Sequence, residues 1–290
     1  MLAGGGPGDQ GTSVPQVVTP QQVPPWLRRL AAAVIETTSV WVNQLGAIGP
    51  DDRRGRRFGA FGKGSIIAFP TGSIYNERWI RIGSETMIGP HVSLTAGMAP
   101  GQEMVSDPVV SIGDRTLIGQ GSYIVGHFSI EIGDDIQTGP YVYITDQNHA
   151  YEDPDVPIGR QWPVESSVSI GSGSWLGTGV IVLPGARIGR NVAVGAGSVV
   201  VGEIPDHCVA VGVPARVVKQ YVAGDGWIAT NARHNNNTGI REGASGGVDD
   251  HGGDDHERSD PRSGGVREAV ENSLGQDATF FQRPVVPGDR

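Results

Sequence analysis

His149 is the residue whose type and position best suit acid–base chemistry. It lies near the start of a polar stretch, DQNHAYEDPDVPIGRQW, which covers residues 146–162. Imidazole gains and loses a proton near neutral pH, so a histidine on a fixed edge can act as a general base. The alternative is an ordinary loop histidine bonded to backbone, and spacing alone does not separate the two. Asp146 and Glu152 could orient the ring, although solvated loop carboxylates are the simpler interpretation.

Two other residues with reactive side chains stand out. His127 lies in a short interruption of the repeat described next, where it could contact a substrate or merely fill a bulge. Cys208 is the single cysteine of the chain, and its apolar neighbours indicate a packed thiol. An internal disulfide is therefore impossible, and nothing indicates an oxidising compartment.

The element that must position these residues is a repeat with a period of six. One residue in six is aliphatic, or threonine in one case, at the following positions: Ile82, Ile88, Leu94, Ile112, Ile118, Ile124, Ile132, Thr138, Ile144, Ile170, Leu176, Val182, Ile188, Val194 and Val200. The residue after each follows the order Gly, Gly, not Gly five times, as in Gly83, Gly89 and Thr95. The six-residue unit is thus nested in a unit of three faces.

A period of six is neither helical nor a strand alternation sustained along one line. It predicts a chain that runs straight, turns and runs straight again, so that three faces close a triangular coil. The aliphatic residue of each face would point inward, and successive coils would pair as parallel strands about 4.8 Å apart. The sequence therefore predicts an all-β, single-stranded parallel β-helix. An irregular coil is expected before it, with Ile66 and Ile74 inside.

Three interruptions of the repeat are informative. The intervals from Leu94 to Ile112, from Ile124 to Ile132 and from Ile144 to Ile170 all exceed six residues. Each excess follows the member of the trio that is not glycine, so all three insertions should leave the prism at the same edge. Loops gathered on one edge of a rigid scaffold favour a functional site there.

Composition restricts the remaining possibilities. The net charge of −9 offers no basic face for nucleic acid. No apolar run reaches membrane-spanning length, and no signal-peptide pattern is present, so a cytoplasmic protein is expected. We expect a disordered tail at 1–23, a capping helix and loop at 24–61, the β-helix domain at 62–222 and a disordered acidic tail at 223–290.

The predicted helix carries an apolar face. Trp26, Leu27, Leu30, Val34 and Trp41 fall on one side of it. A helix that caps the open end of the prism is the simplest interpretation. A membrane-surface helix is the alternative, but two arginines beside this face are few for that role.

Three sequence segments together resemble the galactoside, maltose and capsular-sugar O-acetyltransferases. They are TDQNHAYEDPDVPI, IGSGSWLGTGVIVLPGARIGRNVAVGAGSVV and IPDHCVAVGVPARVV, in this order. These enzymes belong to the hexapeptide-repeat acyltransferases. The resemblance implies a left-handed β-helix, acetyl-coenzyme A as co-substrate without a metal, a sugar or glycan acceptor, and a homotrimer in which coenzyme and base meet between two prisms.

The resemblance also implies roles for single residues. His149 matches the general base, and the backbone N–H of Thr178 matches the donor to the oxyanion. The family's coenzyme A contacts fall on Trp175, Thr178, Ala196, Arg216 and Lys219. On the acceptor side the match is poorer. An asparagine of the family falls at Gly119 and an aspartate at His127, and Trp162 is a further candidate for acceptor contact.

Two other functions remain open on the sequence. A γ-type carbonic anhydrase uses the same prism but needs three histidines at a zinc ion. Outside the tail the chain offers four, in scattered contexts: His91, His127, His149 and His207. A non-catalytic β-helix scaffold is the second alternative, and the insertions on one edge argue against it.

Overall fold

A computed structural model describes residues 23–230 of the chain. The chain divides into two compact units, and the boundary lies between Leu45 and Gly46. The first unit contains most of helix α1 (Pro25–Gly46), which has no buried residue. The helix is therefore confirmed, while its role as a cap stays a prediction. None of the helices in residues 23–230 combines the length and the apolar character needed to cross a bilayer.

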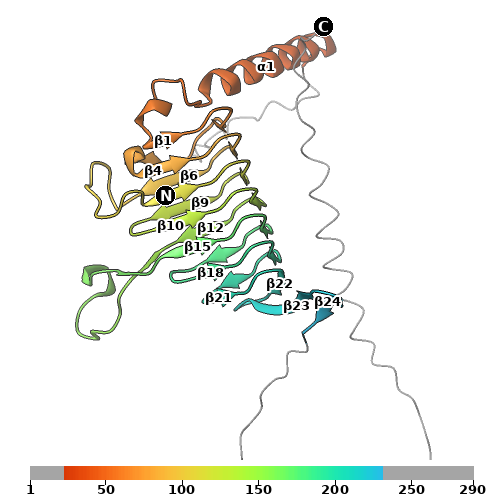
Figure 1. The fold of residues 1–290 in the computed structure, drawn as a ribbon. Helices are drawn as coiled ribbons and strands as arrows, with labels where there is room; N and C mark the ends of the chain where they lie inside the picture. The colour runs from red at the N-terminus through yellow and green to blue at the C-terminus, as the bar shows by residue number, and fades with distance from the viewer. Residues whose placement is uncertain (1–22, 231–290) are drawn as a thin grey trace, which may run out of the picture. The chain divides into compact units, whose positions relative to one another are not determined.

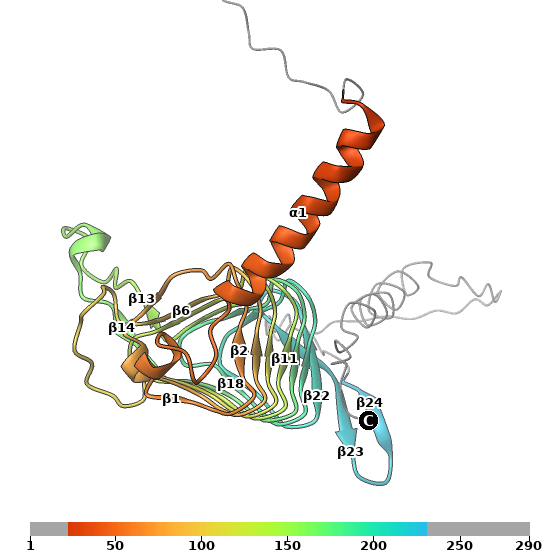
Figure 2. The same ribbon diagram turned by 90° about the horizontal axis from the view of Figure 1, so that it is seen from above.

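The second unit is a prism of stacked coils with three parallel sheets as its faces (Figures 1 and 2). The first sheet contains β1 (Ala60–Phe61), β4 (Ile80–Ile82), β7 (Val110–Ile112), β10 (Ile130–Ile132), β15 (Val168–Ile170), β18 (Arg187–Ile188) and β21 (Glu203–Ile204). The second contains β2 (Ile66–Ile67), β5 (Met87–Ile88), β8 (Leu117–Ile118), β11 (Gln137–Thr138), β16 (Trp175–Leu176), β19 (Ala193–Val194), β22 (Cys208–Val211), β23 (Arg216–Val222) and β24 (Gly226–Ala229). The third contains β3 (Ile74–Tyr75), β6 (Ser93–Ala96), β9 (Tyr123–Gly126), β12 (Tyr143–Thr145), β17 (Ile181–Val182) and β20 (Val199–Val200).

The chain visits the first, second and third sheets in turn, one coil after another, as in a left-handed parallel β-helix. A separate two-stranded ribbon pairs β13 (Gln147–Asn148) with β14 (Val164–Glu165). Three single turns of 3-10 helix complete the elements: η2 (Gly55–Arg57), η3 (Glu77–Trp79) and η4 (Ile158–Arg160). The predicted fold class is confirmed.

The core consists of the residues that the six-residue repeat predicts to point inward. All fifteen positions of the six-residue repeat are buried, with at most 3% of any residue exposed. Thr138 fits among them because its hydroxyl accepts a hydrogen bond from the Gly119 N–H at 2.8 Å. In the irregular first coil the expectation for Ile66 is wrong. Ile67 is the buried residue, because it lies in register with Ile88, and Ile66 points outward.

The C-terminal end of the prism turns back on itself. Strand β22 adds to β19 in parallel, and β23 and β24 then continue the second sheet in antiparallel pairing. Strand β24 lies within the range for which the sequence predicts a disordered tail, so regular structure extends past residue 223. Residues 1–22 and 231–290, which contain most of the two predicted tails, lie outside the described part.

Candidate functional site

Three insertions leave the prism where strands of the third sheet end and strands of the first begin; we call this the insertion edge. Residues 97–109 follow β6, residues 127–129 follow β9, and residues 146–167 follow β12. Figure 2 shows the first and third of these projecting on the same side. The prediction that all insertions share one edge is confirmed.

The longest insertion begins and ends in the ribbon of β13 and β14. Gln147 lies opposite Glu165, and Asn148 lies opposite Val164. The ribbon closes the neck of the insertion and carries Glu165 back to the prism, beside His127.

His127 joins the three insertions. Its Nδ1 contacts the carboxylate of Glu165, and its Nε2 lies 3.3 Å from the side-chain nitrogen of Gln102. The His127 side chain is 12% exposed, so the imidazole is largely shielded from water, whereas that of Glu165 is 33% exposed. Sequence reasoning missed Glu165 and Gln102, because each comes from an insertion without any period.

Asp146 anchors the short insertion, residues 127–129, to the prism. Its carboxylate accepts hydrogen bonds from the backbone N–H groups of His127, Phe128 and Ser129, at 2.7–2.8 Å. The residue is fully buried, and this desolvation raises its pKa although the three N–H groups act in the opposite direction. Asp146 is thus neither a solvated loop carboxylate nor, by the contacts it makes, a partner of His149.

His149 follows the ribbon directly. Its backbone N–H donates to the Asn148 side chain at 3.0 Å, and its own side chain is exposed, with no ring hydrogen bond to the rest of residues 23–230. Trp162 lies in the same insertion and is 84% exposed. An exposed imidazole at the neck of a loop can meet a ligand or a second protein surface.

A different edge carries the other predicted residues. Gly119, Thr178 and Ala196 follow β8, β16 and β19, where the second sheet turns into the third; we call this the Thr178 edge. Thr178 accepts a hydrogen bond from Gly197 at its carbonyl, at 2.9 Å. Its N–H donates to no acceptor within the described chain.

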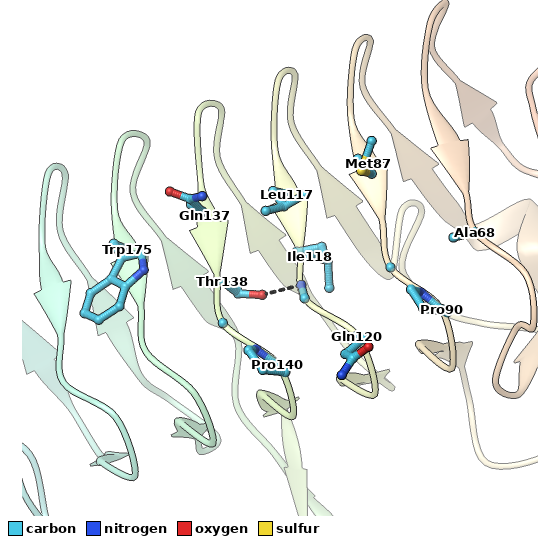
Figure 3. A pocket seen from close by; sticks show the side chains of 13 residues that line it. Ala68, Met87, Pro90, Leu117, Ile118, Gln120, Gln137, Thr138, Pro140 and Trp175 are labelled. Atoms are coloured by element: carbon cyan, nitrogen blue, oxygen red, sulfur yellow. Dashed lines mark hydrogen bonds between the residues drawn. The ribbon is translucent and has the colours of Figure 1, made fainter. Parts of the chain in front are cut away.

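The outer face of the second sheet beside this edge forms a shallow groove of about 330 Å³. Figure 3 shows Met87, Leu117, Gln137 and Trp175 along it on successive strands. Gly119 lines the same groove. Its N–H donates to the Thr138 hydroxyl and is therefore already occupied. A half-buried tryptophan among aliphatic side chains suits an extended, amide-containing ligand.

Two exposed cations lie further along the second sheet. Arg216 and Lys219 are both on β23, and Arg216 pairs in register with Val211 of β22. The Arg216 guanidinium donates to the carbonyl of Ala215 at 2.9 Å and has donors left for an anion. The predicted coenzyme residues thus share one sheet and its edge, and they fit a ligand with phosphates at one end.

The two groups of predicted residues occupy different edges of one prism. Trp175, Thr178 and Gly119 belong to the second sheet and its edge, whereas His127 and His149 belong to the insertion edge. A single chain therefore does not bring the candidate base to the Thr178 N–H. Within residues 23–230 no three His, Cys, Asp or Glu side chains gather as a metal site, so this part of one chain does not form the three-histidine site of the carbonic anhydrase alternative.

Comparisons with protein-family models match two parts of the prism. Residues 167–202 match the bacterial transferase hexapeptide model of six repeats, and residues 109–145 match the hexapeptide repeat of succinyl-transferase.

Several relatives are named as acetyltransferases. The "putative lipopolysaccharide biosynthesis O-acetyl transferase WbbJ" of Escherichia coli is 34% identical over 163 residues, which cover 54% of this chain and 79% of that protein. A "probable acetyltransferase" of Mycobacterium tuberculosis is 36% identical over 49% of this chain and 42% of that protein. The galactoside O-acetyltransferase of Escherichia coli is 33% identical over a stretch that covers 40% of this chain and 60% of that protein. The chain thus spans about half of the length of the mycobacterial and the galactoside proteins.

Solved structures share the fold. The N-acyltransferase AntD of Bacillus cereus, as a single-site variant with dTDP and coenzyme A, superposes with a TM-score of 0.51 at 23% identity, over 60% of this chain and 90% of that chain. At this identity the likeness concerns the β-helix alone.

Proposed function

Since this chain belongs to the family of hexapeptide-repeat acetyltransferases, we propose that it transfers an acetyl group from acetyl-coenzyme A to a hydroxyl of a sugar, glycan or glycolipid. The observation that carries the proposal is its 34% identity over 79% of WbbJ, a protein named as a putative O-acetyl transferase. The Thr178 N–H, which has no acceptor within residues 23–230, and the cations of β23 support the coenzyme half of the site. The insertion edge with its two histidines supports the acceptor half.

The proposed reaction is direct transfer. The neutral imidazole of His149 takes the proton of the acceptor hydroxyl as its oxygen attacks the thioester carbonyl, since a hydroxyl is nearly inert at neutral pH without a base. The carbonyl oxygen becomes negatively charged, and the Thr178 N–H stabilises it. The tetrahedral intermediate then collapses, the carbon–sulfur bond breaks, and the His149 imidazolium returns its proton to the sulfur of the departing coenzyme A.

The coenzyme lies along the second sheet in this proposal. Trp175 packs against the pantetheine arm, Ala196 and Thr178 face it at the edge, and Arg216 and Lys219 bind its phosphates. The acceptor is held near the insertion edge by His127 and Trp162, with Gly119 across from them on the next prism.

Assembly completes the site in this proposal. His149 and Thr178 lie on different edges, so they can meet only where the insertion edge of one chain faces the Thr178 edge of another. A closed ring of three prisms satisfies this at every interface. We expect light scattering to give a trimer, and an active monomer would contradict the arrangement.

The test measures coenzyme A release from acetyl-coenzyme A with a panel of methyl glycosides and small alcohols. With the best acceptor, His149→Ala should slow turnover by roughly 10²–10⁴-fold, the contribution of a positioned general base. Binding of coenzyme A should not change, because binding precedes proton transfer. His207→Ala, at the third edge of the prism, serves as the control. Near wild-type turnover in a folded His149→Ala trimer would remove His149 from the mechanism.

A further inference from the structure

The hydrogen bonds around His127 determine which of its ring nitrogens carries hydrogen. The backbone N–H of Met98 donates to Gln102 Oε1 at 2.8 Å, and this fixes the orientation of the Gln102 amide. The NH₂ group of Gln102 therefore faces His127 Nε2, at 3.3 Å. An NH₂ group only donates, so Nε2 must be the bare nitrogen, and Nδ1 must carry the hydrogen that it shares with Glu165.

From this geometry we infer that Glu165 and Gln102 prepare His127 to accept a hydrogen bond from the acceptor substrate, with Gln102 occupying the substrate's place at Nε2 until it arrives. The inference rests on the proposed transfer to a hydroxyl. It makes Glu165 a positioning residue, and it makes His127 specific for a group that donates hydrogen.

The contact with Gln102 suits a displaceable partner. At 3.3 Å between the two nitrogens it is longer than most hydrogen bonds, so little is lost when a hydroxyl replaces it. The imidazole itself does not move, because Asp146 holds the His127 backbone and Glu165 holds Nδ1. A preset acceptor on a rigid bulge discriminates better than one that must be ordered during binding.

The groups around His127 also restrict the charge of the substrate, because Glu165 places a carboxylate beside the ring. A carboxylate or phosphate has no hydrogen to offer and would face Glu165. The substrate class indicated is thus an uncharged compound with at least two hydroxyls, one bound by His127 and a neighbouring one acylated.

The first experiment needs no acceptor. In the uniformly ¹⁵N-labelled full chain, two-bond correlations from the ring protons report which ring nitrogen of His127 is bare, with His127→Gln to assign the signals. We expect a bare Nε2 in the wild type. Gln102→Glu keeps an oxygen for Met98 but puts a carboxylate oxygen at Nε2, so hydrogen should move onto Nε2. Hydrogen on Nε2 in the wild type would overturn the inference.

The second experiment measures KM for the best sugar of the panel. Gln102→Ala removes the competing donor and should lower this KM about twofold to threefold, the low end of the value of a neutral hydrogen bond, because the contact is long. Gln102→Glu should raise it at least about tenfold, since Nε2 can no longer accept. Both should leave coenzyme A binding and kcat near wild type.

The outcomes separate two failures. If the wild type releases no acceptor-dependent coenzyme A with any hydroxyl compound, the proposed function fails. If the wild type is active but both Gln102 variants keep its KM, the inference fails while the function stands. A His127→Gln variant that loses kcat roughly 10²-fold or more at unchanged KM would make His127 the base, and would also overturn the binding role.

Discussion

Asp146 offers a direct test of how the insertion edge is held together. Asp146→Ala removes the acceptor of three backbone N–H groups, those of His127, Phe128 and Ser129. Each orphaned donor costs about 1 kcal/mol, at the low end of the usual range because water can enter the vacated space, which gives about 3 kcal/mol. Removing a carboxylate whose burial is unfavourable offsets part of this loss. We expect a net loss of about 2 kcal/mol in the free energy of unfolding.

Urea unfolding followed by circular dichroism measures this loss. Asp155→Ala, in the same insertion, removes an exposed carboxylate and should stay within about 0.5 kcal/mol of wild type. The Asp146→Ala protein should also show a raised KM for the acceptor, since His127 loses its anchor, with unchanged binding of coenzyme A. Equal stability of the two variants would refute the view that Asp146 organises the bulge.

Three further outcomes follow from the same structure. Burial raises the folded-state pKa of Asp146 above its ordinary value of 3.8. The protonated carboxyl therefore adds stability in full below pH 3.8, and this stability is lost as the pH rises through the folded-state pKa. The free energy of unfolding of the wild type minus that of Asp146→Asn should fall between these two pH values, and a constant difference would contradict the raised pKa. Burial, together with Asp206, raises the pKa of the Cys208 thiol, so iodoacetamide at about pH 8 should label the native chain far more slowly than the chain in urea, and equal rates would refute this. Arg216→Ala should weaken coenzyme A binding about fivefold at low salt and less at high salt, with exposed Arg187→Ala as the control, and an effect independent of salt would remove the phosphate contact.

The repeat made the scaffold predictable from sequence. A residue that returns every sixth position can be inside only if the chain turns at that interval, so the fifteen core positions followed from spacing alone. The irregular first coil lacks this constraint, which is why the register there was off by one residue, at Ile67 instead of Ile66. The spacing also does not show how the hydroxyl of Thr138 is satisfied in the core, because its partner, the N–H of Gly119, belongs to a neighbouring coil.

The candidate site was predictable in place but not in detail. The insertions have no period, so the sequence contains no sign that Glu165 returns to His127, 38 residues earlier. Nor does it show that Asp146, at the start of a polar stretch, is the buried end of that stretch. Both facts depend on how the ribbon of β13 and β14 closes, and a pair of two-residue strands leaves almost no trace in a sequence.

The order Gly, Gly, not Gly explains why the insertions are confined to one edge. At the two glycine edges the turns of successive coils stack in direct contact. A Cβ on Gly119 would lie 2.3 Å from the Gly139 carbonyl oxygen, and one on Gly113 would lie 2.6 Å from the Gly133 carbonyl carbon. An insertion there would have to push apart the turns above and below. At the third edge Val125 and Thr145 lie in register on neighbouring strands, so successive coils accommodate side chains, and the chain can leave and return. The glycine spacing therefore restricts both where a loop can grow and which edge is left smooth for a ligand or another prism, so a site that uses both kinds of edge needs two chains.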